Sequence, residues 1–185
     1  MIKAALFAVS LGLGVPIQAA DFNLAKLMYD LAQVERIEAE FQEQKTLAIL
    51  DTPLEFSGTL SYRAPAYIKK QTTHAESFII DGDWLTIETP EQGRRQYSLT
   101  GYRELQPLSA ALRGLLSGDL TLLQRYYTLS LSGNTNAWML ELKPVAQTAA
   151  EFIEHIRVMG HANRIDHLQI LETNGDHSSM TISPH

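Results

Sequence analysis

Cysteine is absent from the 185 residues of this chain. Without a thiol, the protein cannot form a disulfide, use thiolate catalysis or bind zinc through cysteine. It also cannot carry the acylated cysteine that anchors a lipoprotein. A domain of this length can build its hydrophobic core without covalent links, so the absence says nothing against an oxidising compartment.

Basic residues are also in short supply. The chain has 15 Lys and Arg against 21 Asp and Glu, with a net charge of −6. Nucleic-acid-binding proteins usually display a basic stripe, and none is visible here. The acidity likewise argues against attachment to anionic membranes by charge. With 45% hydrophobic and 19% charged residues, the composition is typical of one globular domain and not of a disordered chain.

Recognisable catalytic motifs are missing as well. The sequence contains no G-x-S-x-G nucleophile elbow, no phosphate-binding loop and no H-E-x-x-H motif. The triad letters at 176–178 are adjacent, so their side chains should point in different directions and belong to a turn. Glu43 and Lys45 share a strand face, which favours an ion pair or a rim position over acid–base catalysis.

A weak metal-ligand pattern lies near the C-terminus, where one glutamate and three histidines are close in sequence: Glu154, His155, His161 and His167. His155 and His161 flank an expected turn at Gly160, so their side chains could approach each other across two strands. We favour outward-facing polar positions over a metal site.

The N-terminus has the pattern of a secretory signal peptide. Lys3 is followed by an apolar run over residues 4–15, then by Pro16 and by the small residues Ala19 and Ala20. The run is too short to span a bilayer, which needs about 20 apolar residues, and no second run follows. The sequence therefore predicts a signal peptide over 1–20 and a soluble, exported domain over 21–185.

Hydrophobic periodicity predicts an α+β domain. Leu24, Leu27, Met28, Leu31 and Val34 form one helical stripe, which Asp21 or Asn23 can cap. A leucine-rich helix from about Leu105 should end at Gly118, and Asp119 should cap a second helix running through Leu123. Alternating residues predict strands at 41–47, 54–64, 78–80, 84–87, 96–99, 127–133, 138–142, 152–159, 164–171 and 177–183.

Nine to eleven strands with short connections should form a mostly antiparallel sheet. Asp81-Gly82 and Asn174-Gly175 are typical of hairpin turns. Sheets of this size curl, and the helices would cover one apolar face. Periodicity alone does not separate a filled core from a hollow lined by the same apolar residues, so both interpretations stay open at this point.

Three segments, in order and spacing, resemble the LolA family, the periplasmic carriers of outer-membrane lipoproteins. Residues 41–45 are similar to its F-x-Q strand, and residues 56–62, followed by Pro65, are similar to its S-x-G-x-L strand. Residues 80–85 are similar to its D-G hairpin. The stretch 112–123 resembles a divergent LolA-like branch.

The resemblance implies an incomplete antiparallel β-barrel covered by helices that form a lid over a hydrophobic cavity. It implies a periplasmic, monomeric carrier of lipid or lipoprotein acyl chains, moving cargo between an inner-membrane donor complex and an outer-membrane acceptor. It implies no catalysis, metal, cofactor or nucleic acid. The expected cavity residues are Phe56, Leu60, Tyr62, Phe78, Ile80, Trp84, Leu112, Leu115, Leu116 and Trp138.

One position departs from the family. The family places an arginine immediately before the strand-ending proline, where it contributes to lid closure, whereas this chain has Ala64. Arg63, one residue earlier, should point to the opposite face of the sheet. Two alternatives to lipoprotein carriage stay open, because the sequence identifies neither the lipid nor whether the core is filled: carriage of a different lipid or acylated intermediate in envelope biosynthesis, or a non-enzymatic interaction module with a filled core.

Overall fold

The computed structural model describes residues 22–102 and 105–184. Within this part of the chain, eleven antiparallel strands form one sheet in the order β6-β5-β4-β3-β2-β1-β11-β10-β9-β8-β7. The strands are β1 (Arg36–Thr46), β2 (Leu54–Arg63), β3 (Tyr67–Thr72), β4 (Ser77–Asp81), β5 (Trp84–Thr89), β6 (Gly93–Ser98), β7 (Tyr127–Asn134), β8 (Ala137–Pro144), β9 (Ile153–His161), β10 (Arg164–Glu172) and β11 (His177–Pro184).

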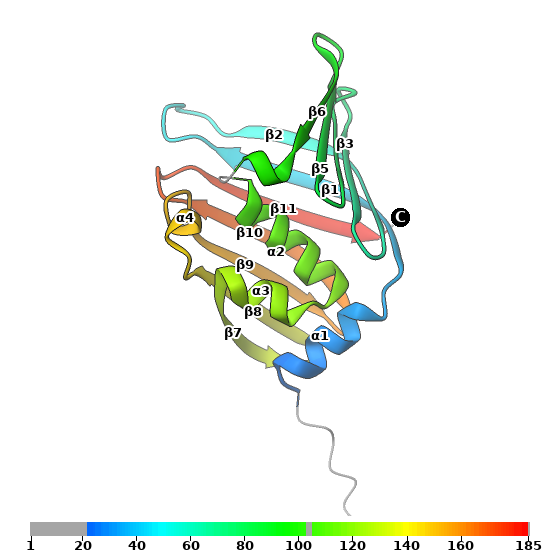
Figure 1. Ribbon diagram of the computed structural model, residues 1–185, viewed down its shortest axis with the longest axis vertical. Coiled ribbons are helices and arrows are strands. Elements are labelled where there is room, and N and C mark those ends of the chain that lie inside the picture. Colours follow the sequence, from blue (N-terminus) through cyan, green and yellow to red (C-terminus); the bar gives the residue numbers. More distant parts are fainter. Residues whose placement is uncertain (1–21, 103–104, 185) are drawn as a thin grey trace, which may run out of the picture.

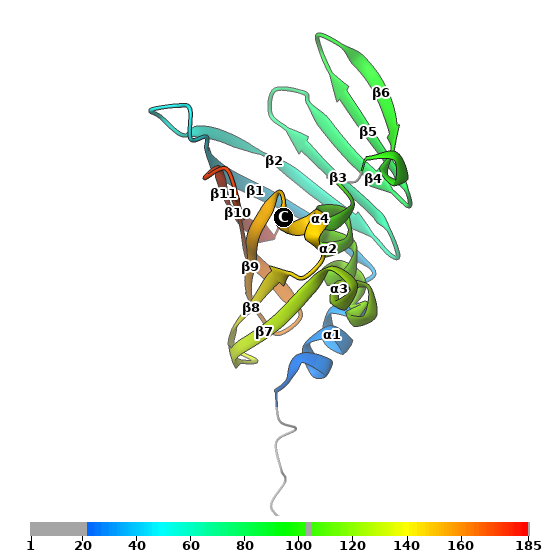
Figure 2. The ribbon, with the colours of Figure 1, turned by 60° about the vertical axis from the view of Figure 1, so that its left-hand side comes forward.

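The sheet is strongly curved but does not close, because β6 and β7 form its two edges. The helices α1 (Leu24–Ala32), α2 (Gln106–Ser117) and α3 (Leu120–Tyr126) lie on its concave face, with a short α4 (Gln147–Ala150) near one end (Figures 1 and 2). The expected fold class, an incomplete antiparallel barrel covered by helices, is confirmed.

Local sequence signals explain where the helices begin and end. The Asn23 side chain accepts a 3.0 Å hydrogen bond from the backbone N–H of Lys26 at the start of α1, and Asp119 accepts one of 2.9 Å from Leu122 at the start of α3. These bonds satisfy backbone donors that have no partner within the helix. Gly118 ends α2 in the left-handed conformation, with φ of 66°, which suits a residue without Cβ.

The main core lies between the three helices and one half of the sheet. Leu27 and Leu31 of α1 and Leu123 of α3 pack against buried residues of β8 and β9, including Leu140 and Val158. Strand alternation places these residues on the concave face, since Leu140 is directly opposite Val158. This half of the structure is therefore a filled core.

Two features differ from the sequence expectation. Strand β3 was not expected, because Lys69 and Lys70 interrupt the apolar alternation in that stretch. The turn expected at Gly160 is wrong: β9 continues through Gly160 to His161, and its partner strand begins at Arg164. Gly160 is needed for packing, because a Cβ there would lie 2.6 Å from the Trp138 ring. The predicted signal peptide lies outside the described residues.

Candidate functional site

An apolar cavity of about 280 Å³ lies between α2 and the concave face of the sheet. It occupies the half of the concave face that belongs to β1, β2, β3, β10 and β11, next to the filled core. Its lining is predominantly aliphatic: Ile37, Glu43, Leu60, Ser61, Tyr62, Ile68, Lys70, Leu108, Leu112, Leu115, Leu116, Val158, Ile165, Leu168, Ile170, Met180 and Ile182.

Helix α2 supplies the leucine wall of the cavity. Leu108, Leu112, Leu115 and Leu116 follow one another at helical spacing, so they share one face. Gly114 belongs to the other face, and a Cβ there would lie 2.7 Å from Leu123 Cγ. This close approach holds α2 against α3 while the leucines remain turned toward the sheet. We call α2 the lid helix.

The strands contribute residues of one alternation phase. Tyr62 of β2 is opposite Ile37 of β1 on one side and Ile68 of β3 on the other. Because side chains alternate between the faces, residues two positions away, such as Leu60, return to the cavity. Strands β10 and β11 complete the lining with Leu168 and Met180, which are directly opposite each other.

A charged pair interrupts the apolar lining. Lys70 Nζ forms an ion pair with Glu43 Oε2, and Ser178 Oγ donates a 2.5 Å hydrogen bond to Glu43 Oε1. The ammonium group also lies 4.9 Å from the centroid of the Phe41 ring, within the range of a cation–π contact. The side chains of Glu43 and Lys70 are only 10% and 25% exposed, so water screens this pair less than a surface pair.

The Tyr62 hydroxyl is a second polar feature of the lining. Its oxygen is buried and has no hydrogen-bond partner among the described residues. Burial raises the pKa of the Tyr62 hydroxyl above its usual value, because the phenolate is disfavoured away from water. The group therefore stays protonated in the cavity and is free to donate a hydrogen bond.

Arg113 connects the lid helix to the far part of the sheet. Its Nη1 donates a 3.1 Å hydrogen bond to the carbonyl oxygen of Gly82, in the turn between β4 and β5. The same nitrogen lies 3.3 Å from Asp83 Oδ1. We call this pair of contacts the Arg113 latch. Through these contacts, a side chain of α2 connects the helix to the β4–β5 turn of the sheet.

Ala64 and Arg63 lie at the end of β2, where the sequence departs from the family pattern. Ala64 is exposed and does not border the cavity. The Arg63 guanidinium lies 4.1 Å from the centroid of the Tyr67 ring, whereas the preceding residue, Tyr62, lines the cavity. Arg63 therefore points to the opposite face, as predicted, and no bulge shifts the register of β2 against β1.

The structure brings together half of the cavity residues expected from sequence: Leu60, Tyr62, Leu112, Leu115 and Leu116. Phe56, Phe78 and Ile80 belong to the same alternation phase but lie beyond the cavity. Trp84 is 50% exposed, and its pairing opposite Asp81, next to the Ile80–Leu85 pair, places it on the other face. Trp138 is buried in the core, where its Nε1 donates a 3.0 Å bond to Ala162 O.

Several cavity residues were missed by sequence reasoning. Leu168, Ile170, Met180 and Ile182 lie on strands that were expected, and their alternation would have identified them. Lys70 carried no such signal, because its strand was not expected. Glu43 was expected to form an ion pair or a rim contact, and it does form an ion pair, although with Lys70. Lys45 Nζ instead lies 4.0 Å from Glu172 Oε1.

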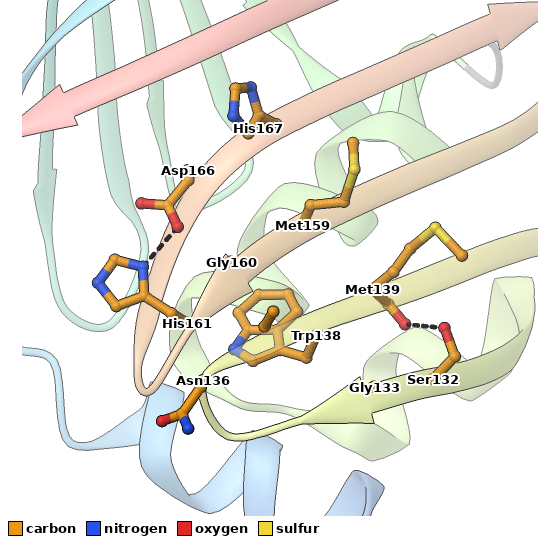
Figure 3. A pocket seen from close by; sticks show the side chains of 11 residues that line it. Ser132, Gly133, Asn136, Trp138, Met139, Met159, Gly160, His161, Asp166 and His167 are labelled. Atoms are coloured by element: carbon orange, nitrogen blue, oxygen red, sulfur yellow. Dashed lines mark hydrogen bonds and ion pairs between the residues drawn. The ribbon is translucent and has the colours of Figure 1, made fainter.

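The weak catalytic and metal patterns do not form a site in the described residues. Ser178 turns toward Glu43, whereas Asp176 accepts a 2.7 Å bond from the backbone N–H of Ala48. A second, open pocket spans the β7–β8 and β9–β10 hairpins, and Trp138, Met139 and His161 are among the residues that line it (Figure 3). His161 Nδ1 lies 2.6 Å from Asp166 Oδ2 in this pocket. Across residues 22–102 and 105–184, no three histidines and carboxylates are grouped to hold a metal ion. In the same ranges, no helix is both long and apolar enough to cross a bilayer.

Comparison with known proteins agrees with this architecture. Residues 16–182 match the family described as outer membrane lipoprotein carrier protein LolA-like. The match covers most of the sequence, so the chain belongs to this LolA-like family. Comparison with curated proteins finds no match.

Solved structures show weak similarity. A LolA superfamily protein from Nitrosomonas europaea is 8% identical, with a TM-score of 0.46 over 88% of this chain and 92% of that one. A chain of the MucA/MucB complex from Pseudomonas aeruginosa is 12% identical, with a TM-score of 0.45 over 87% of this chain and 56% of that one.

Proposed function

We propose that this protein is a periplasmic carrier that holds the acyl chains of a lipid or lipoprotein in the cavity under α2 during transfer toward the outer membrane. The observation that carries the proposal is a predominantly aliphatic cavity covered by the leucine face of one helix, in a chain of the LolA-like family. The apolar lining supports acyl chains as cargo, because each buried CH₂ contributes about 0.8 kcal/mol.

The size of the cavity supports a movable lid. At about 280 Å³, it is slightly smaller than the roughly 300–1,000 Å³ typical of ligand sites. More than one acyl chain would enter only if α2 moved away from the sheet. In the empty state, the leucines of α2 occupy the surface that lipid would cover. Lid closure therefore competes with lipid and keeps the net affinity moderate, which permits release.

A direct test uses an environment-sensitive acyl probe with an uncharged head. The probe should bind the wild type, and Leu112→Glu or Leu116→Glu should weaken binding, because a carboxylate without a partner is costly in an apolar site. Met139→Glu is the matched control, since Met139 is exposed outside the cavity. Unchanged binding in both cavity variants would place the probe elsewhere, and no binding to the wild type would favour a filled interaction module.

The export of the protein is a separate part of the proposal. The leader pattern at residues 1–20 supports cleavage before Ala20 or Asp21. Intact-mass measurement of protein from the periplasm of a Gram-negative host should give a chain that begins at one of these residues. A mass that includes Met1 would contradict export by this route.

Ala64 favours a second candidate, carriage of a different lipid or acylated intermediate in envelope biosynthesis. A methyl group cannot form the hydrogen bonds that the family arginine can offer to a lid. We expect that this chain does not sustain growth when a Gram-negative host is depleted of its general lipoprotein carrier. Partial rescue by Ala64→Arg would support lipoprotein cargo, and rescue by the wild type would contradict the second candidate. Failure of both proteins would favour it, and native mass spectrometry would then identify the co-purified lipid.

A further inference from the structure

The Glu43–Lys70 pair lies at one end of the cavity. Glu43 and Ile37 both line the cavity and are six positions apart on β1, a separation of about 20 Å at about 3.3 Å per residue. Ile37 therefore marks one end and Glu43 the other. An acyl chain extended along β1 would place its polar head at one of these ends, and the Glu43 end carries the charged groups.

The hydrogen-bonding groups of this cluster are matched to one another. One carboxylate oxygen of Glu43 is paired with Lys70, and the other accepts the bond from Ser178. Lys70 also faces the rings of Phe41 and Phe56, with centroids at 4.9 and 6.0 Å. Glu43 and Lys70 are the two charged residues in the described lining of the cavity. The charges cancel, so the empty site is electrically neutral.

This neutrality determines which head groups fit. A carboxylate head beside the intact pair would bring a second negative charge to one ammonium group, and a head that displaced Glu43 would leave that buried carboxylate without a partner. An ammonium head would likewise add an uncompensated positive charge or leave Lys70 unpaired. Breaking a buried pair is strongly unfavourable, because the remaining charge is uncompensated. An ester, amide or hydroxyl head can instead accept from Lys70 or donate to Glu43 while the ion pair stays intact.

We propose that Glu43, Lys70 and Ser178 form a head-group subsite that selects uncharged polar heads of acylated molecules over free fatty-acid anions and alkylammonium cations. The inference rests on the proposed function, because it assumes that acyl chains enter the cavity. It deepens that function by naming the substrate class as esters and amides of fatty acids, a class that includes acylated glycerol and acylated peptide heads.

The experiment uses three amphiphiles with the same number of carbon atoms in the chain and different charge: monolauroylglycerol, laurate and dodecylammonium. Their dissociation constants are measured at neutral pH by displacement of the uncharged acyl probe. The wild type should bind monolauroylglycerol at least about tenfold more tightly than either ion. Glu43→Gln should shift the preference toward laurate, and Lys70→Met should shift it toward dodecylammonium.

Two controls separate this subsite from general charge effects. Lys69→Met removes a positive charge from the same strand, but Lys69 belongs to the opposite alternation phase from Lys70. Glu55→Gln removes an exposed negative charge from β2. Neither variant should change the order of affinities. Thermal unfolding of each variant shows whether it is folded, and the wild-type ranking tests the proposal independently of any variant.

The outcomes distinguish the subsite from the carrier function. If the wild type binds all three amphiphiles with equal affinity, lipid carriage stands and the head-group subsite is overturned. If folded Glu43→Gln and Lys70→Met keep the wild-type ranking, the selectivity does not come from this pair and the proposal is also overturned. If neither the probe nor any of the three amphiphiles binds the wild type, the carrier function fails, and the subsite that rests on it fails too.

Discussion

Arg113 of the lid helix donates a 3.1 Å hydrogen bond to the carbonyl oxygen of Gly82, in the turn between β4 and β5. The contact joins an element over the cavity to a part of the sheet that is distant from the filled core. We expect this contact to help hold α2 closed, a role that the resemblance to the family assigns to the arginine at the position of Ala64. In this chain the contacting arginine lies on α2, whereas the family position is at the end of β2.

Arg113→Met should loosen the lid. The variant keeps much of the side-chain stem and removes the bond to Gly82, so the free energy of unfolding should fall by about 1 kcal/mol. If removing this bond destabilises mainly the closed position of α2, an acyl probe should bind about fivefold more tightly. The factor follows because 1.4 kcal/mol corresponds to about a tenfold change in affinity. Probe titration and urea unfolding measure the two effects. Asp83→Asn should have a smaller effect, because Asp83 is exposed.

The matched control for the latch is Arg125→Met on α3, where the side chain is exposed. It removes the same charge from a neighbouring helix without touching the β4–β5 turn. Equal probe affinity in the wild type and Arg113→Met would show that the latch does not limit entry of the acyl chain.

Gly118→Ala should be strongly destabilising. A Cβ at Gly118 would lie 2.2 Å from the carbonyl oxygen of Met28, and the backbone has a positive φ of 66°. Strain and overlap with a neighbouring helix should together lower the free energy of unfolding by about 2–3 kcal/mol. Gly101→Ala, where no atom lies within 4 Å of the added Cβ, is the control. If Gly118→Ala lowers the free energy of unfolding by less than Gly101→Ala does, then α1 can shift to accommodate the added methyl group.

Tyr62→Phe should leave the empty protein as stable as the wild type or more stable. The hydroxyl is buried without a partner, so its removal recovers a desolvation cost of about 1 kcal/mol. Thermal unfolding without lipid measures the change. Ser61→Ala is a contrasting variant, since Ser61 Oγ donates a 2.7 Å bond to Glu38 and its loss should not stabilise. A marked destabilisation by Tyr62→Phe would show that the hydroxyl has a partner in solution.

The contribution of Glu141 to the free energy of unfolding should depend on pH. The side-chain hydrogen bond from Arg157, followed by that from Lys143, holds the pKa of Glu141 below its usual value. A carboxyl with a lowered pKa in the folded state stabilises above its unfolded pKa of about 4.3 and loses this contribution as pH falls further. The stability advantage of the wild type over Glu141→Gln should therefore be largest above about pH 5 and shrink toward pH 3.

The control for this titration is Glu91→Gln, at an exposed turn position. Its difference from the wild type should stay flat over the same pH range. Urea unfolding at successive pH values gives both curves. A constant gap for Glu141→Gln would mean that the contacts with Arg157 and Lys143 do not persist in solution.

Local signals were sufficient for most of the secondary structure. The helices begin and end where the sequence predicted, at Asn23, Gly118 and Asp119. This is so because capping depends on neighbouring backbone groups alone. The leucine stripe of α2 and the alternation of β2 also depend on local periodicity. The exception is β3, which was not predicted. Its Lys70 lies on the concave face, where the alternation pattern predicts an apolar residue.

The sequence by itself determined which residues are apolar and which faces they share. It did not determine whether such a face is covered by protein or left as a cavity. Leu60 and Trp138 have the same alternating environment in sequence, yet Trp138 is buried in the core and Leu60 borders the cavity. The difference comes from where α1, α2 and α3 lie on the curved sheet, since coverage depends on packing between elements far apart in the chain. The Glu43–Lys70 pair has the same origin, because only the register of β1, β2 and β3 brings the two side chains together.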